Sequence, residues 1–459
     1  MSVTSPPRGP EIERDRDLER RVADLEALIE EARRRARRRR QRNWGAALLV
    51  AAAVAGLLIG FGGHGGGGAG SAALAHAPGS QAPVANADSP ALGALPPDAG
   101  RVESFAFDSR NPEIVYVLTN GGVPGTPVPT HVFKTTDGGA HWQATATSGS
   151  GWVGGKEALT ADPRHPGTLY AGTELAVYKT VDGGKSWRPS KRGLITPPRR
   201  DRDKGWVLAL AVDPADTNVV YAGSDRVSKS TDGGQSWKTV FPPHATPNRE
   251  TVSALAIAPS RPEAIYAITD DFGPVSSTPA DGRTTIYKST DAGTTWQATR
   301  VVGGDVAPTA LAVDPRDPTS VYAAISADLM KTTNAGKTWQ PIAHGLPISD
   351  TRGTCHCLSG GGVTALAVDP RRSGTVYAAL TQGGIYKTTD GGQTWTRALN
   401  TPTLSLDAVA VDPARPATIY AAGEGPCGPT AQSCSSPSPA NELWIFRSTN
   451  GGRTWATAP

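Results

Sequence analysis

The stretch Thr135-Thr136-Asp137-Gly138-Gly139-Ala140-His141-Trp142 decides the fold, because its pattern recurs through the chain. The pattern is Ser or Thr, any residue, Asp or Asn, any residue, Gly, two further residues and Trp. Six further copies end at Trp187, Trp237, Trp296, Trp339, Trp395 and Trp455. Seven copies spaced 43 to 60 residues apart indicate a repeat architecture.

A second motif, Leu-Ala-Val-Asp-Pro-x-x-Pro-x-x-Val-Tyr-Ala, alternates with the first. Each unit of about 50 residues predicts four short strands, which in the sixth unit are 364–368, 375–380, 384–388 and 394–398. Asp-Pro marks the first turn and Asp-Gly-Gly the third. One such sheet cannot bury both faces, whereas seven arranged radially can. We therefore predict an all-β, seven-bladed β-propeller, whose ring closes by packing rather than by a swapped strand.

The first motif is the Asp-box, also called the BNR repeat. Residues 101–459 resemble the Asp-box propellers of sortilin-type receptors, xyloglucanases, sialidases and photosystem II assembly factors. The resemblance implies the fold but leaves the activity open, since these relatives include enzymes and non-enzymes. A sialidase would need several arginines converging on one carboxylate and a Tyr nucleophile, which the sequence does not place. Xyloglucanases pair two propellers around a cleft, and this chain has one.

The acidic position of the Asp-box is predicted to be structural rather than catalytic or calcium-binding. Asp caps a tight hairpin by accepting backbone N–H bonds, and Gly supplies a positive φ. Asn can replace Asp in this role, but it is a poor replacement in a charged metal site. We therefore expect no metal and no cofactor, and a structural role for Asp137, Asp182, Asp232, Asp291, Asn334, Asp390 and Asn450. The repeated tyrosines are likewise expected in the core.

Charge and hydropathy divide the chain of 459 residues into four parts. These are an Arg-rich cytoplasmic helical tail at 1–43, a transmembrane anchor at 44–63, a flexible Gly/Ala/Pro-rich linker at 64–99 and the propeller at 100–459. Thirteen Arg precede the apolar segment, so the positive-inside rule predicts an extracytoplasmic propeller on a single-pass anchor in the cell membrane. A cleaved signal peptide ending near Ala73-Leu74-Ala75 is the rival interpretation.

Charge and hydropathy also bear on two possible partners, nucleic acid and a second copy of the chain. Residues 44–459 carry 33 basic and 33 acidic residues, which excludes an electrostatic nucleic-acid binder. Leu18, Val22, Leu25 and Ile29 form a short apolar seam in the tail, which predicts at most weak self-association.

Function is expected where the repeats differ. The long loops share one face, and they are 119–131, 190–205, 241–250, 270–284, 341–362 and 422–441. Near the channel mouth on that face we expect Glu103, Glu157 and Asp407, from the neighbouring blades 1, 2 and 7. Such carboxylates are candidates for an acid/base pair in glycoside cleavage, for binding a cation, or for solvated polar residues around a channel.

Loop residues supply the remaining candidates. One candidate for binding an anionic glycan or a protein is the group Arg199, Arg200 and Arg202 with Trp206 and Trp152. The alternative is a solvated loop with its own ion pairs. Outside the cytoplasm the cysteines are expected to form disulfides. The four cysteines are Cys355, Cys357, Cys427 and Cys434. Disulfide pairing within one loop and cross-pairing between loops are both open, and so is a metal site that includes His356.

From the sequence we predict a non-enzymatic module that binds a protein or polysaccharide through its long-loop face. The first alternative is a glycoside hydrolase that uses Glu103, Glu157 or Asp407. The second, by resemblance, is an assembly factor for a membrane protein complex.

Overall fold

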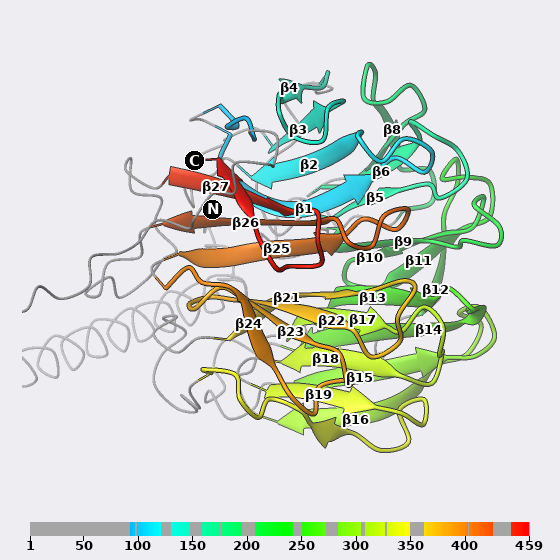
Figure 1. Cartoon of the computed structure of the whole chain (residues 1–459). Coiled ribbons are helices and arrows are strands. Elements are labelled where there is room, and N and C mark those ends of the chain that lie inside the picture. Colours follow the sequence, from blue (N-terminus) through cyan, green and yellow to red (C-terminus); the bar gives the residue numbers. More distant parts are fainter. Residues whose placement is uncertain are drawn as a thin grey trace, which may run out of the picture. The chain divides into compact units, whose positions relative to one another are not determined.

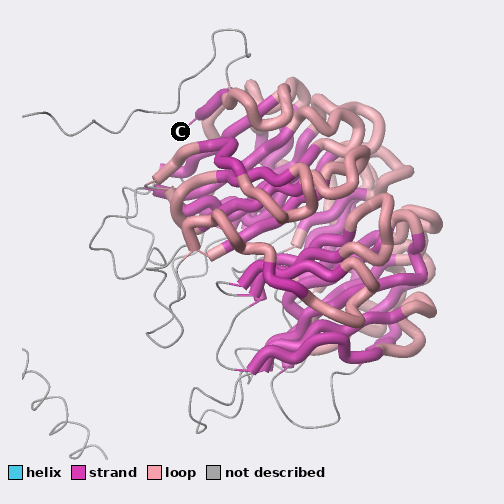
Figure 2. The backbone as a smooth tube through the Cα atoms, turned by 60° about the horizontal axis from the view of Figure 1, so that its bottom comes forward, coloured by secondary structure: helices cyan, strands magenta, loops and turns pink. Residues whose placement is uncertain are grey.

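The computed structural model describes residues 92–96, 99–120, 130–146, 158–173, 176–194, 207–241, 250–271, 283–303, 308–325, 328–348, 362–402, 404–425 and 442–458. They form seven sheets, each of four consecutive strands (Figure 1). Figure 2 shows only strands and loops in this part of the chain. The chain divides into two compact units, Met1–Gly79 and Ser80–Pro459, and the second contains all seven sheets.

The predicted tail at 1–43, anchor at 44–63 and most of the predicted linker lie outside the described residues. Within the described ranges no helix is long and apolar enough to cross a membrane.

Each blade takes its strands in chain order. Blades 1 to 4 contain β1 Arg101–Phe107, β2 Val115–Asn120, β3 Thr130–Thr135, β4 Gln143–Ala144; β5 Leu159–Ala161, β6 Leu169–Gly172, β7 Val177–Thr180, β8 Arg188–Ser190; β9 Ala209–Val212, β10 Val220–Gly223, β11 Val227–Ser230, β12 Lys238–Phe241; and β13 Glu250–Ala258, β14 Arg261–Asp271, β15 Arg283–Ser289, β16 Gln297–Gly303. Blades 5 to 7 contain β17 Pro308–Val313, β18 Val321–Ile325, β19 Asp328–Thr332, β20 Gln340–Pro341; β21 Val363–Val368, β22 Val376–Leu380, β23 Ile385–Thr388, β24 Thr396–Leu399; and β25 Ser405–Val411, β26 Ile419–Gly425, β27 Glu442–Ser448, β28 Ala456–Ala458.

The seven first strands form a closed ring. Each lies beside the first strand of the next blade, and β25 lies beside β1. All strand pairings within the blades are antiparallel, as in blade 6. The four strands of blade 6 begin and end within two residues of the predicted bounds. The prediction of a seven-bladed propeller is confirmed.

The two faces of the ring carry different loops. The first-to-second and third-to-fourth strand turns share what we call the box face, where Gly138 of the Asp-box donates to the carbonyl of Glu113 in the first turn. The second-to-third strand loops share the opposite face, which we call the mouth face; there Asn120 at the end of β2 pairs with Thr130 at the start of β3. The predicted long loops lie largely outside the described residues.

Each Asp-box is a hydrogen-bonded hairpin. In blade 2 the hydroxyl of Thr180 donates to Asp182 Oδ1 at 2.7 Å and accepts the amide of Gly184 at 3.0 Å. The carboxylate of Asp182 accepts the amide of Ser186 at 2.9 Å and its hydroxyl at 2.6 Å. The four other boxes that carry Asp repeat this arrangement, with His141 donating through its ring nitrogen in blade 1. These hydrogen bonds hold the hairpin of each box in one geometry.

The two Asn boxes keep the hairpin and reverse one hydrogen bond. Asn334 Nδ2 donates to the Thr338 hydroxyl at 2.8 Å, and Asn450 Nδ2 donates to the Thr454 hydroxyl at 2.6 Å. The glycine at the fifth position of the box motif has φ between 84° and 97° in all seven boxes. The preceding residue also has a positive φ, even where it is Ala292 or Ala335.

The boxes join each blade to the one before it. Tyr170 and Lys179 of blade 2 both donate to the carbonyl of Gly233 in the box of blade 3, at 3.1 and 2.8 Å. The same carbonyl in four other boxes, those of blades 1, 4, 6 and 7, accepts bonds from Tyr221, Lys229, Lys331, Tyr377, Lys387, Tyr420 and Arg447. In six blades the lysine ammonium also lies 5.2 to 5.8 Å from the centre of the tyrosine ring. The seven repeated tyrosines are among the largest fully buried side chains.

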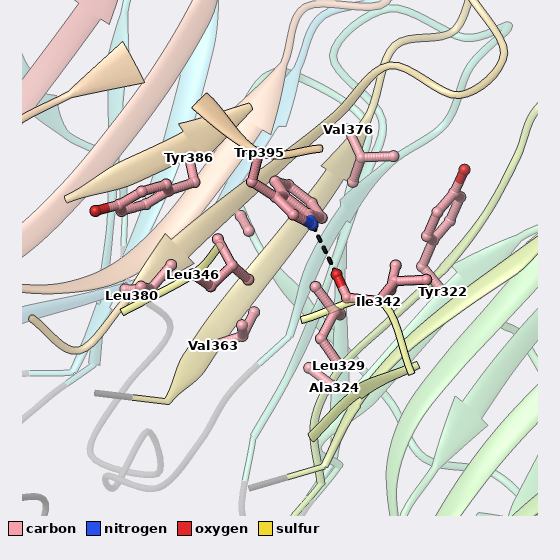
Figure 3. Packing of buried hydrophobic residues seen from close by; sticks show 11 residues of the cluster. Tyr322, Ala324, Leu329, Ile342, Leu346, Val363, Val376, Leu380, Tyr386 and Trp395 are labelled. Carbon is pink, nitrogen blue, oxygen red and sulfur yellow. Dashed lines mark hydrogen bonds between the residues drawn. The ribbon is translucent and has the colours of Figure 1, made fainter. Parts of the chain in front are cut away.

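The box tryptophans extend the same junctions. Figure 3 shows the indole of Trp395 in blade 6 pointing at the carbonyl of Ile342 in blade 5, to which it donates at 2.8 Å. Tyr322, Leu329 and Val376 are buried in the same apolar cluster. The hydrophobic clusters therefore lie between neighbouring blades, so that each sheet is covered by the next.

We expect Asp182→Ala to lower the free energy of unfolding by about 1 kcal/mol, because two donors of Ser186 lose their acceptor. Asp182→Asn should retain most of that stability, as Asn334 does in its box. Hydrogen bonds from Ser186 hold the pKa of Asp182 at about 2, so its contribution is present above about pH 4 and is lost as the pH falls towards 2. Urea unfolding near neutral pH and near pH 3 measures this. Equal losses for Ala and Asn near neutral pH would contradict it.

A matched pair of tyrosines tests the blade junctions. Tyr377→Phe removes the hydroxyl that donates to Gly451 at 3.2 Å and should cost about 1 kcal/mol. Tyr322→Phe should be nearly neutral, because the buried Tyr322 hydroxyl has no hydrogen-bond partner within the described residues. The urea midpoints of the two variants measure this difference in stability. An equal loss of stability in both variants would show that the hydrogen bond of the Tyr377 hydroxyl does not hold the junction.

Candidate functional site

The candidate carboxyls on the first strands lie at a repeated irregularity of the ring. In five blades the register of the first two strands shifts at one residue on the mouth face, a β-bulge. A bulge inserts an extra residue and redirects its side chain. The residues at the shift are Glu103, Ser253, Thr309, Thr364 and Asp407.

At two of these bulges a hydroxyl joins neighbouring blades. Thr309 donates to the carbonyl of Val363 at 2.6 Å, and Thr364 donates to the carbonyl of Leu406 at 2.5 Å. Asp407 occupies the next position in this series and faces the junction with blade 1. An ionised carboxylate cannot donate a hydrogen bond, so this junction needs a different contact.

Arg101, at the start of β1, supplies that contact. Its Nη2 donates to Asp407 Oδ1 at 2.6 Å. Its Nε lies 3.7 Å from Glu103 Oε1 and 3.8 Å from Glu424 Oε1. Glu424 reaches the group because it pairs with Ser405 in the β25–β26 hairpin. We call these four residues, Arg101, Glu103, Asp407 and Glu424, the mouth cluster.

Burial separates the members of the mouth cluster. The side chain of Asp407 is 3% exposed, those of Glu103 and Glu424 are 13% and 19% exposed, and that of Arg101 is 40% exposed. Burial raises the pKa of Asp407 to about 7; Arg101 opposes this, while Glu424 and Glu103 add to it. Asp407 can therefore hold a proton near neutral pH. Glu103 and Glu424 are both more exposed than Asp407 and are therefore better placed to meet a ligand.

Sequence reasoning selected Glu103 and Asp407 and missed Arg101 and Glu424. Arg101 is the first basic residue after the predicted linker, and hairpin register would have placed Glu424 opposite the start of β25. The structure brings Glu103 and Asp407 to the same arginine. Within the described part of the chain, no group of three or more His, Cys, Asp or Glu side chains is arranged to hold a metal ion.

The other predicted site residues lie outside the described residues, so no geometry is given for them. They are Glu157, Trp152, Arg199, Arg200, Arg202, Trp206, Cys355, Cys357, Cys427 and Cys434.

Asp407 should make stability depend on pH. With a pKa of about 7 folded and about 3.9 unfolded, the folded protein binds more protons between these values, so this contribution to stability falls as pH rises from about 4 to 7. Asp407→Asn should flatten that dependence in calorimetric unfolding temperatures. Glu113→Gln is the control, since Glu113 pairs with Arg415 at 2.6 Å across the same two blades on the box face. Parallel profiles for wild type and Asp407→Asn would refute this.

Comparison with known proteins finds similarity to xyloglucanases. No family model matches the chain. A curated xyloglucanase from a Paenibacillus species is 25% identical over 345 residues, which are 65% of this chain and 31% of the relative. A xyloglucanase from Hypocrea jecorina is 26% identical over 345 residues, 64% of this chain and 38% of the relative. The chain thus spans about a third of the length of these curated relatives.

Among solved structures, the GH74 xyloglucanase from Xanthomonas campestris matches with a TM-score of 0.51 and 17% identity, over 80% of this chain and 61% of that one. YCF48 from Cyanidioschyzon merolae is also similar, with a TM-score of 0.48 and 14% identity over 72% of this chain and 94% of that one. The chain is a seven-bladed β-propeller with four-stranded blades, and the curated proteins similar to it are xyloglucanases.

Proposed function

We propose that the propeller acts on a polysaccharide as a glycoside hydrolase, with xyloglucan as the first substrate to test. The observation that carries the proposal is the similarity to curated xyloglucanases over 345 residues. This reverses the order of the sequence-based hypotheses, in which a non-enzymatic binding module came first and a hydrolase second.

The mouth cluster supports this proposal chemically. Glycoside cleavage uses one carboxyl as a proton donor and a second as a base or nucleophile. Asp407, whose pKa burial raises to about 7, can hold the proton, and Glu103 is a carboxyl beside the same arginine that is more exposed than Asp407. Glu157, predicted on the neighbouring blade 2, is the third candidate.

A binding module without hydrolysis is the second candidate, and a specific contact favours it. The Asp407 carboxylate is engaged by Arg101 at 2.6 Å and its side chain is 3% exposed, so a sugar cannot reach it directly in this arrangement. An ion pair of this kind stabilises the junction of two blades whether or not the protein is an enzyme. The assembly-factor hypothesis stays a prediction, because no contact in the described ranges favours it.

We further propose that residues 44–63 anchor the propeller in the cell membrane with the mouth face outside the cytoplasm. The proposal rests on the charge asymmetry around the apolar segment. An extracytoplasmic location would give the propeller access to a polysaccharide.

Reducing-sugar release from xyloglucan by the full-length protein tests the proposed activity. We expect Glu103→Gln and Asp407→Asn each to lower kcat at least about 100-fold, because each removes an acid/base group. Glu157→Gln belongs in the same series. Glu113→Gln, which breaks an ion pair between the same two blades on the box face, should leave the rate unchanged.

The outcomes separate the two candidates. Release that is lost in the carboxyl variants but kept in Glu113→Gln supports hydrolysis. Retention of the protein on xyloglucan without release supports the binding module. An outcome in which the protein neither releases sugar from xyloglucan nor is retained on it would contradict the proposal that the propeller acts on this polysaccharide.

A further inference from the structure

The outer strand of each blade contacts the Asp-box of the next blade by a regular rule. The glycine of each box lies against the residue three positions after the preceding blade's Trp. A Cβ placed on Gly184 would lie 2.6 Å from Thr145, on Gly336 2.8 Å from Thr299, and on Gly392 2.6 Å from Ile342. Boxes 3, 4 and 7 follow the same rule with Ser190, Val240 and Ala398.

The junction between blades 7 and 1 departs from this rule. At this junction the nearest described atom to a Cβ on Gly139 is Leu92 Cδ2, at 2.8 Å, which belongs to the segment before blade 1. The next residue, Gly93, donates its amide to the Gly139 carbonyl at 2.7 Å. At the junction of blades 1 and 2, the amide of Ala146 donates to the Gly184 carbonyl at 3.0 Å in the same way. Leu92 and Gly93 thus occupy the positions that an outer strand fills elsewhere.

The box tryptophans do not all share one acceptor. Trp187, Trp237, Trp395 and Trp455 each donate an indole N–H to the residue three positions after the preceding Trp. The indole of Trp296 donates to Gly293 in its own box, and the indole nitrogens of Trp142 and Trp339 are buried without a hydrogen-bond partner within the described residues. The segment that precedes blade 1 therefore supplies the packing of this junction without an acceptor for the indole, as is also the case at the junction of blades 4 and 5.

The same segment is buried against both blades. Leu95 and Ala99 are 7% and 1% exposed. Their apolar cluster contains residues of blade 1 and of blade 7, namely Val102, Val117, Phe133, Ala408, Ala422 and Ile445. Composition assigned this stretch to a flexible linker, whereas the described residues 92–96 and 99 are part of the packed propeller.

We propose that residues 92–96 and 99 belong to a ring-closing strap, in which Leu92 and Gly93 take, at the Asp-box of blade 1, the place that the outer strand of the preceding blade takes at the other boxes. The strap leads directly into Arg101, which binds Asp407 across the same junction. Displacing the strap therefore loosens the junction of blades 7 and 1 and the mouth cluster together, while the other five blades keep their contacts. The inference is independent of the proposed function.

Gly93→Ala in the full-length protein tests the strap. A Cβ at this position would clash with the backbone oxygen of Ala140, which cannot move without disturbing the box of blade 1. Ala94→Ser is the control, because Ala94 is the exposed neighbour. Hydrogen exchange is followed by mass spectrometry in peptides covering 101–107, 135–146 and 442–458, with peptides of blades 3 to 5 as internal references.

We expect Gly93→Ala to speed exchange about tenfold in blades 1 and 7, to leave blades 3 to 5 unchanged, and Ala94→Ser to match the wild type. Exchange unchanged in all blades, or accelerated equally in all blades, would overturn the strap. If Gly93→Ala does not fold, Leu92→Ala provides the milder variant, and the same local pattern is required of it.

Discussion

One carbonyl group of the Asp-box joins neighbouring blades at five of the seven junctions within the described residues. It belongs to the residue directly after the box Asp or Asn, whose positive φ turns the peptide towards the preceding blade. At four of these junctions it accepts both a tyrosine hydroxyl and a cationic side chain, as the carbonyl of Gly451 does from Tyr377 and Lys387 at 3.2 and 2.9 Å. Hydrogen bonds from charged donors contribute about 1.5–3 kcal/mol each, so these contacts stabilise the ring in addition to the apolar packing between its blades.

This constraint determines where function can lie. The box face is occupied by hairpins that must keep their geometry to hold the next blade. On the mouth face the bulged residues also join blades, but they differ in type from blade to blade. Thr309 and Thr364 use their hydroxyls to join blades, whereas Asp407 needs Arg101 to do so and draws Glu103 and Glu424 into one charged group.

The junction of blades 7 and 1 differs from the others in its charged contacts. Arg447 takes the place of the lysine, Arg415 pairs with Glu113 on the box face, and Arg101 pairs with Asp407 on the mouth face. This is the junction at which the ring joins residues more than 300 positions apart in sequence. Contacts so distant close the largest loop, which explains why charged pairs and a strap reinforce this junction.

The blades could be predicted because the signals that build them are local. Box residues, turn residues and buried tyrosines all lie within one repeat, so the sequence pattern and the hydrogen bonds coincide at residues such as Asp182 and Tyr377. The mouth cluster was only half predicted, since Arg101 and Glu424 enter through hairpin register and ring closure. The strap was missed because Gly, Ala and Pro around Leu92 have the composition of a linker, and only the tertiary structure shows what they contact.

The central claim is that the repeated box residues are structural and that the mouth face binds the ligand. Hydrogen exchange of the full-length protein with and without xyloglucan tests it most directly. The account predicts protection around Arg101, Asp407 and Glu424 and in the loops beside them, with the box hairpins unchanged. Protection confined to the box hairpins, such as 180–187 and 388–395, would contradict it.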